Sequence, residues 1–249
     1  MIPRIKIKRL SKKYNNNYIL KDINLSINKR EIISIIGPSG VGKTTLLKII
    51  SGLIKAEEGQ IKINDIDINN IKEERITGYI FQAPNLLPWR NTLENVTLAQ
   101  EILNTKSKDE IKEIARKNLA LVGLSDYESF YPKELSGGMQ QRVAIARALS
   151  FNPKILLMDE PFSALDEITR EKMNELILDI WNKNILDNIF LVTHSITDAV
   201  YLSDKVIVIN GIPGKIKSII KINLPKKRTI KIKDSKKFKE LVECIKHKL

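Results

Sequence analysis

The chain has 249 residues, 43% of them hydrophobic and 29% charged, and a formal net charge of +13 at pH 7. This composition is that of a folded globular protein and excludes a disordered or fibrous chain. No uncharged apolar stretch approaches the ~20 residues of a membrane-spanning helix, and the N-terminus lacks the apolar core of a signal peptide. The single cysteine, Cys244, agrees with a reducing compartment. We therefore expect a protein that stays in the cytoplasm.

The positive charge has two interpretations. Most of it is lysine spread along the whole chain, which indicates a general bias in composition towards Lys, Ile and Asn. The segment 215–248 concentrates it, with Lys226-Lys227-Arg228 and few aromatic side chains that could stack on bases. We expect a solvated basic face there and no nucleic-acid partner. Attraction to acidic lipid headgroups is the functional alternative.

The predicted strands are of two kinds. Apolar and polar residues alternate at residues 4–10, 20–28 and 59–68, which predicts an antiparallel sheet with one face exposed. Continuous apolar runs at residues 32–36, 155–158, 189–193 and 206–209 predict strands that helices cover on both faces, as in a parallel sheet.

Helical periodicity lies between the apolar runs, at residues 108–122, 139–149, 169–182 and 235–246. Strands that alternate with helices predict an α/β fold. A short polar region at residues 92–109 marks where a helical insertion begins and ends.

The pattern G-x-x-x-x-G-K-[ST] of a phosphate-binding loop occurs between the strand at residues 31–36 and a helix-like run at residues 45–51. Its glycines let backbone N–H groups turn towards phosphate oxygens. Lys43 is expected to reach the β and γ phosphates of ATP, and the Thr44 hydroxyl to bind Mg²⁺. The residues expected to contact the nucleotide are Gly37, Pro38, Ser39, Gly40, Val41, Gly42, Lys43, Thr44 and Thr45.

Two adjacent carboxylates close the buried run at residues 155–158. Asp159 is expected to lie beside the phosphate-binding loop and to hold Mg²⁺ through water. Glu160 is then directed at the γ-phosphate, where a carboxylate orients or deprotonates the attacking water. Activation of water favours hydrolysis over transfer to a second substrate, as in a kinase.

The segment Leu135-Ser136-Gly137-Gly138-Met139-Gln-Gln-Arg resembles the signature loop of the ATP-binding subunits of ABC transporters. Taken alone, it offers a hydroxyl, flexible glycines and the N-terminus of a helix that starts near Met139 to an anion. The resemblance implies that Ser136, Gly137 and Gly138 contact ATP held by a second copy of the chain. We therefore expect a homodimer clamped around two MgATP.

Further positions resemble this superfamily in chain order, and their roles are implied by the resemblance. Gln82 corresponds to the glutamine that senses Mg²⁺ and the attacking water. Residues 163–166 correspond to the loop that crosses the dimer interface. His194, at the end of a buried strand, corresponds to the histidine that hydrogen-bonds the γ-phosphate. Tyr14 stands where the family places an aromatic ring on adenine, with the nearby Tyr18 as the alternative.

A narrower resemblance, to the nitrate/sulfonate/taurine import group, lies in residues 81–90, 131–132, 193–200 and 212–214. Met139 replaces the glutamine of the commonest signature, a change that occurs within this group. Importers of vitamin precursors or other solutes share much of the pattern and remain an alternative. A non-transport ABC ATPase that acts on nucleic acid is the other.

The resemblance implies a P-loop NTPase core with a mixed, mainly parallel sheet, an antiparallel β subdomain and a helical subdomain. We expect an ABC ATPase domain at residues 1–225, with the helical insertion at about 90–150, and a basic extension with a short helix at 226–249.

The implied activity is ATP hydrolysis coupled to transport of a small anionic solute. ATP binding closes the dimer and hydrolysis reopens it. The implied partners are two membrane permease subunits and an extracytoplasmic solute-binding protein, which places the chain peripherally at the cytoplasmic face of the membrane. The apolar strip at residues 86–89 is expected to dock a short helix of the permease, or else to plug the space under the helical insertion.

Overall fold

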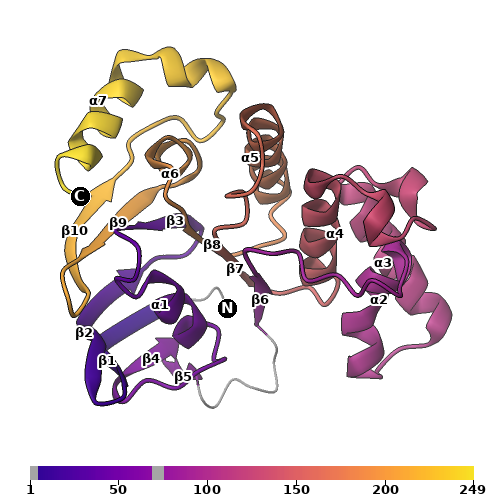
Figure 1. Cartoon of the computed structure of the whole chain (residues 1–249), viewed down its shortest axis with the longest axis horizontal. Coiled ribbons are helices and arrows are strands. Elements are labelled where there is room, and N and C mark those ends of the chain that lie inside the picture. The colour runs from indigo at the N-terminus through magenta and orange to yellow at the C-terminus, as the bar shows by residue number, and fades with distance from the viewer. Residues whose placement is uncertain (1–4, 69–75) are drawn as a thin grey trace.

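The computed structural model describes residues 5–68 and 76–249, which form two β-sheets with helices around them (Figure 1). The predicted α/β fold is confirmed. Arg4, the first residue of the first predicted strand, lies outside the described residues. Within the described parts of the chain, no helix is long and apolar enough to cross a membrane.

The antiparallel sheet has the strand order β2-β1-β4-β5. Its strands are β1 (Ile5–Tyr14), β2 (Asn17–Ile27), β4 (Glu58–Ile63) and β5 (Ile66–Asp67).

The mixed sheet has the order β10-β9-β3-β8-β7-β6 and is parallel apart from the pairing of β10 with β9. Its strands are β3 (Glu31–Ile36), β6 (Thr77–Ile80), β7 (Ile155–Asp159), β8 (Asn188–Val192), β9 (Lys205–Asn210) and β10 (Lys215–Lys221).

Helices cover the mixed sheet and also form a group to one side of it. The helices are α1 (Lys43–Ile50), α2 (Thr92–Leu103), α3 (Lys108–Leu121), α4 (Gly137–Leu149), α5 (Glu167–Asn182), α6 (Ile196–Leu202) and α7 (Lys236–Lys246). Helices α2, α3 and α4 pack on one another and extend away from the sheets (Figure 1).

The continuous apolar runs are explained by burial on both faces of the mixed sheet. Neighbouring residues of β3 point into opposite cores, with Ile32 among the helices α4 to α7 and Ile33 among α1 and the antiparallel sheet. The same alternation separates Ile189 from Phe190 in β8. Because each of these four side chains has an apolar environment on its own side, all four can be apolar.

Helix α2 occupies part of the region that the sequence pattern assigned to a polar border. Its N-terminus is held by a capping box in which Asn91 accepts from the backbone of Glu94 and Glu94 accepts from the backbone of Asn91. Asn95, Thr97 and Gln100 are buried on its inner face. Polar residues on the buried face weaken the apolar periodicity, so the helix was not recognised from sequence.

Other differences concern short elements and helix starts. Strand β6, helix α6 and the edge strand β10 were not predicted, because the first two are too short for a clear period and β10 is mostly exposed. Helix α4 starts at Gly137, earlier than predicted, and α5 starts at Glu167 after the N-cap Asp166. Both shifts reflect capping side chains, which fix a helix start more sharply than periodicity does.

The C-terminal segment is attached to the rest of the fold by a buried arginine. The Arg228 side chain is 3% exposed and donates to the carbonyls of Tyr201 and Ser203, at the C-terminal end of α6, at 2.8 and 2.9 Å. A cation at this end of a helix is also favoured by the helix dipole. Phe238 and Ile245 of α7 are buried in the core that covers one face of the mixed sheet.

We predict that Phe238→Ala lowers the free energy of unfolding of the whole domain by about 3 kcal/mol, because it empties a buried aromatic site. Urea denaturation measures the loss. Lys237→Ala, an exposed neighbour on α7, is the control, with an expected change within about 0.5 kcal/mol. Equal stability of the two variants would mean that the C-terminal segment does not stabilise the core.

Candidate active site

The phosphate-binding loop joins β3 to α1 at the carboxyl end of the sheet. Gly42 is the N-cap of α1 and has φ +99°, a backbone conformation that glycine adopts without strain. A Cβ at Gly42 would lie 2.7 Å from the Leu20 side chain, so space as well as conformation requires glycine here. The chain therefore turns sharply enough to bring the N-terminus of α1 to the sheet edge.

Lys43 points back into this loop. Its Nζ donates to the carbonyls of Gly37 and Pro38, both at 2.9 Å, and its side chain is buried. Burial lowers the pKa of Lys43, and the charges of Glu160 and Asp159 raise it. Because an ammonium has three N–H groups, Lys43 has one left to donate to an anion that enters the loop.

Asp159 is held by two hydroxyls. Thr44 Oγ1 donates to Asp159 Oδ1 at 2.8 Å, and the Tyr79 hydroxyl donates to Oδ2 at 3.1 Å. Burial, together with the charge of Asp159 and the hydrogen bond to it, raises the pKa of Tyr79, so the tyrosine stays a donor near neutral pH. Tyr79 is not among the site residues predicted from sequence.

The Thr44–Asp159 contact fits the Mg²⁺ predicted from sequence. A hydroxyl and a carboxylate are hard oxygen ligands, which Mg²⁺ prefers, and this ion takes most of its other ligands from water and phosphate. In the described parts of the chain, no group of three or more His, Cys, Asp and Glu could hold a metal ion. A hydroxyl and a single carboxylate suit a metal that arrives with a phosphate.

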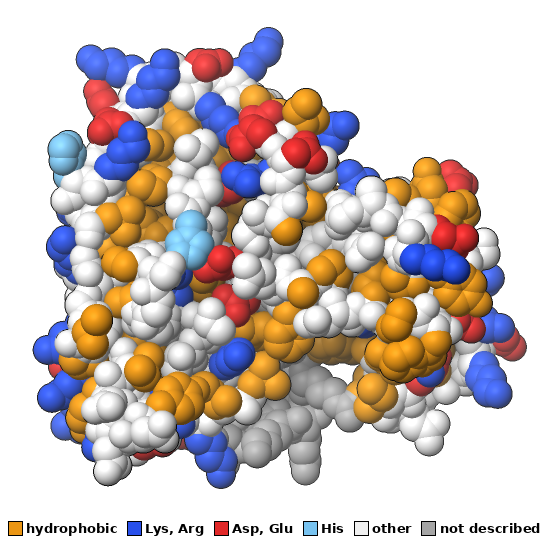
Figure 2. All heavy atoms as spheres, in the orientation of Figure 1, with side chains coloured by type: hydrophobic (Ala, Val, Ile, Leu, Met, Phe, Trp, Pro, Cys, Tyr) orange, Lys and Arg blue, Asp and Glu red, His pale blue; other side chains and the backbone are white. Residues whose placement is uncertain are grey.

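Glu160 and His194 contact each other at the ends of β7 and β8. The distance between His194 Nε2 and Glu160 Oε1 is 2.6 Å. The Glu160 backbone N–H donates to Val192 O at 3.0 Å, which anchors the glutamate to the neighbouring strand. Figure 2 shows a histidine beside acidic side chains near the middle of this face.

A hollow of about 320 Å³ collects most of these groups. Its lining contains the phosphate-binding loop, the start of α1 and the Glu160–His194 pair. The lining residues are Ile19, Ser39, Gly40, Gly42, Lys43, Thr44, Thr45, Glu160 and His194. The chain has thus placed a cation, backbone N–H groups and a carboxylate around one space that can take a phosphate.

Gln82 lies outside this lining and reaches the site through a serine. Gln82 Nε2 donates to Ser163 Oγ at 3.3 Å, and Ser163 Oγ donates to the backbone carbonyl of Glu160 at 3.0 Å. Ser163 belongs to the loop at residues 163–166, which was predicted to cross a dimer interface. The glutamine, the loop and the catalytic candidate Glu160 are therefore connected within one chain.

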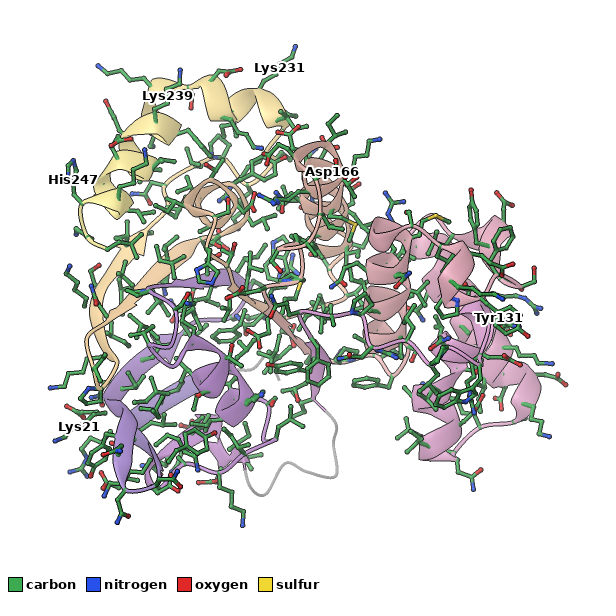
Figure 3. The ribbon with its side chains drawn as sticks, in the orientation of Figure 1. Lys21, Tyr131, Asp166, Lys231, Lys239 and His247 are labelled. Atoms are coloured by element: carbon green, nitrogen blue, oxygen red, sulfur yellow. The ribbon has the colours of Figure 1, made fainter. Side chains whose placement is uncertain are left out.

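The predicted signature residues do not line the hollow of their own chain. Ser136 is the N-cap of α4, and Gly137 and Gly138 form its first turn, so the glycines are helical and not the flexible loop that was expected. A Cβ at Gly138 would lie 2.6 Å from Thr169 Cγ2 of α5. The glycines thus permit close packing of α4 on α5, whose N-cap Asp166 is labelled in Figure 3.

The two adenine candidates also lie outside the lining of the hollow. Tyr14 ends β1 and is largely exposed. The Tyr18 hydroxyl donates to Glu58 Oε1 at 2.7 Å, and the ammonium of Lys13 lies 4.3 Å from its ring centroid. The ring of Tyr14 is the more accessible of the two.

The comparisons with known proteins agree with one another. A family model described as ABC transporter matches residues 20–163. An uncharacterized ABC transporter ATP-binding protein of Methanocaldococcus jannaschii is 45% identical over 229 residues, which are 90% of this chain and 84% of that protein. The aliphatic sulfonates import ATP-binding protein SsuB of Bacillus cereus is 43% identical over 234 residues, 94% of this chain and 89% of that protein.

A solved structure gives the same result for the fold. It is a dimeric ATP-binding cassette in a post-hydrolysis state, bound to ADP and Pi. The two chains share 35% identity with a TM-score of 0.77, over 89% of this chain and 100% of the other.

A phosphate-binding loop that follows a parallel strand, with paired carboxylates at the end of a nearby strand, defines a P-loop nucleotide hydrolase. The family model, which matches more than half of the sequence, identifies a narrower group within this class. The chain belongs to the ABC transporter family, as an ATP-hydrolysing subunit.

We predict that Tyr79→Phe raises the Mg²⁺ concentration that gives half-maximal ATPase activity about tenfold, because one of the two donors that orient Asp159 is lost. The phenyl ring keeps the contact with Phe81, whose ring centroid lies 4.5 Å away. A Mg²⁺ titration at saturating ATP measures the shift. Tyr127→Phe, in the helical part of the fold, is the matched control, and the same Mg²⁺ dependence in both variants contradicts the prediction.

Proposed function

We propose that the chain binds MgATP in the hollow beside Lys43 and hydrolyses it within a homodimer, and that this cycle drives import of a small anionic solute. The observation that supports the chemistry most directly is the contact of Glu160 with His194 next to a buried lysine and a hydroxyl–carboxylate pair. Every other part of the proposal depends on hydrolysis at this site.

The proposed roles follow from the positions of the groups. Lys43 and the backbone N–H groups of the loop bind the β and γ phosphates, with Ser39, Gly40 and Thr45 at the same wall of the hollow. Thr44 and Asp159 hold Mg²⁺, with Gln82 as a further candidate ligand. When bound, Mg²⁺ neutralises charge on the phosphate oxygens.

Glu160 is the proposed general base. Its carboxylate orients a water and accepts a proton from it while the water oxygen bonds to the γ-phosphorus and the bond to the β-phosphate oxygen breaks. In the free chain the carboxylate contacts His194 at 2.6 Å. When ATP binds, His194 can give up this contact and donate to the γ-phosphate instead. The Glu160 carboxylate is then free to accept from the water.

A second copy of the chain is the proposed source of the missing phosphate contacts. Ser136, Gly137 and Gly138 do not line their own hollow, yet Gly137 lies near Leu165 of the loop at residues 163–166 and Gly138 lies beside α5. This loop is largely exposed. The dimeric state of the similar cassette supports the arrangement, in which the signature of one copy faces the ATP of the other.

A permease pair is the proposed partner on the membrane side. Trp89 is 71% exposed, and the backbone next to it is fixed because Leu87 and Asn95 exchange two hydrogen bonds, at 2.8 and 3.2 Å. A hollow of about 440 Å³, lined in part by Ala99, Ile102 and Phe151, lies between the helical part and the mixed sheet. An exposed aromatic side chain on a fixed backbone suits a short amphipathic helix, and the apolar hollow is a second feature of the helical part that could contact the partner.

The solute and location are inferred from the relatives. The import proteins at 43% identity are named for aliphatic sulfonates, which supports an organic sulfonate as the solute and an extracytoplasmic solute-binding protein in the same system. We place the chain peripherally at the cytoplasmic face of the membrane. We keep residues 1–225 as the ATPase domain, 90–150 as its helical insertion and 226–249 as a basic extension folded onto it.

We predict that Glu160→Gln keeps ATP binding and forms a stable dimer, but lowers hydrolysis at least about 100-fold, because the amide cannot accept the proton of water. Size-exclusion chromatography with MgATP and a phosphate-release assay measure the two effects. Glu243→Gln on α7 is the control for removal of an exposed charge. Full turnover of Glu160→Gln, or a variant that stays monomeric at saturating MgATP, would contradict the two-site scheme.

We predict that Trp89→Ala lowers co-purification of the chain with its permease subunits about tenfold, because exposed aromatic anchors dominate such contacts. Ile212→Ala, at a position that is 97% exposed on the β9–β10 turn, is the matched apolar control. The proposed docking surface is wrong if the two variants retain the same amount of permease.

A further inference from the structure

Helices α5 and α6 lie side by side, and each follows a loop of the candidate site (Figure 1). Helix α5 follows the loop at residues 163–166 and starts after Asp166, which Figure 3 labels. Helix α6 starts after Ser195, the residue next to His194. The loop at residues 163–166 is called the interface loop below. A contact between the two helices fixes the position of this loop relative to the loop that carries His194.

The contact that joins the helices is a buried polar pair. Asn174 Nδ2 of α5 donates to Asp198 Oδ1 of α6 at 2.8 Å, and the two residues are 1% and 4% exposed. Ser195 Oγ accepts from the Asp198 backbone N–H at 3.1 Å. Asp198 thereby links α5 to the residue that directly follows His194.

The positive charges near Asp198 come from α5 and from the turn before α7. Burial raises the pKa of Asp198, whereas the hydrogen bonds from Asn174 and Ser195 and the charges of Arg170 and Lys233 lower it. Arg170 lies on α5, and Lys233 lies in the turn before α7. A hydrogen bond in such a poorly solvated place is stronger and more directional than on the surface.

Arg170 extends the connection to the interface loop. Its Nη2 donates to the backbone carbonyl of Leu165 at 3.0 Å. Arg170 and Asp198 also line a hollow of about 290 Å³ whose wall includes Glu160 and His194. Glu160 and His194 also line the phosphate-binding hollow, so they are common to the two hollows. The hydrogen bond to Leu165 and the shared hollow thus connect the loop at residues 163–166 with the surroundings of Glu160 and His194.

An interface between α5 and α6 made of apolar side chains alone would be about as stable as the observed one. Burial of an amide and a carboxylate has a desolvation cost that their hydrogen bond roughly offsets. Asn174 Oδ1 has no hydrogen-bond partner, which adds to the cost. What the polar pair adds is a defined direction and distance between the helices. That is the property a positioning contact needs.

We propose that Asp198, together with Asn174 and Arg170, is a positioning group that sets His194 against Glu160 according to the position of the interface loop. The inference rests on the proposed function. In the dimer, a partner that presses on residues 163–166 moves Arg170 and α5, and the Asn174–Asp198 bond passes this shift to α6 and His194. Each copy then senses closure at its own site.

The test compares two buried asparagines. Asn174→Ala removes the bond to Asp198, and Asn188→Ala removes bonds of similar length to the carbonyls of Asn28 and Glu31, at the opposite end of β8 from the site. Both asparagines are fully buried and both have an unpartnered Oδ1. The two variants should lose similar stability, so that loss of stability is controlled.

We expect Asn174→Ala to lower kcat about tenfold with little change in the KM for ATP, because a small displacement of a positioned group acts on the transition state. We also expect its Hill coefficient for ATP to fall towards 1, while Asn188→Ala keeps wild-type kcat and cooperativity. Equal kcat and equal Hill coefficients in the two variants overturn the proposal. Absence of turnover in the wild-type chain would instead overturn the proposed function, and the positioning role with it.

A reciprocal exchange tests the same bond without a cavity. Asn174→Asp places two carboxylates together and should lower kcat at least about tenfold. Adding Asp198→Asn restores one donor, one acceptor and one negative charge, and should return kcat to within about threefold of wild type. A double variant that is no more active than Asn174→Asp alone overturns the proposal.

Discussion

The parallel pairing of β3 with β8, and of β8 with β7, is the constraint on which the rest of the structure depends. It aligns the carboxyl ends of three strands, so that the loop before Lys43, the Asp159–Glu160 pair and His194 lie at one edge although they are far apart in sequence. Both faces of the sheet are buried, so the register of the strands is fixed by packing on two sides. The packing on the two faces therefore also fixes the geometry of the site.

The charged groups at this edge of the sheet already contact one another or the backbone, and a charged ligand can replace these contacts. Lys43 is surrounded by loop carbonyls and by the fields of Asp159 and Glu160, and both carboxylates have protein partners. In the proposed function, a phosphate and its metal replace these internal contacts. The free chain therefore keeps its buried charges satisfied and still presents the groups that hydrolysis needs.

Sequence was sufficient to predict the local structure around a contiguous motif. The loop before Lys43 and the carboxylates after β7 were identified because a strand, a turn and a helix must follow each other there in a fixed order. It was insufficient where a role depends on neighbours in space. Tyr79 contacts Asp159 only because β6 lies beside β7, and Asp198 contacts Asn174 only because α5 packs on α6. Helix α2 was missed because Asn95 and Gln100 occupy its buried face.

The position of β3 inside the sheet also governs the order of events during synthesis. Its two neighbours, β8 and β9, come from the last third of the chain, so the strand that precedes the phosphate-binding loop has unpaired edges until most of the protein has left the ribosome. Pairing between segments so distant in sequence is slow and leaves apolar edges exposed meanwhile. A chain that ends before β8 and β9 therefore cannot assemble the nucleotide site.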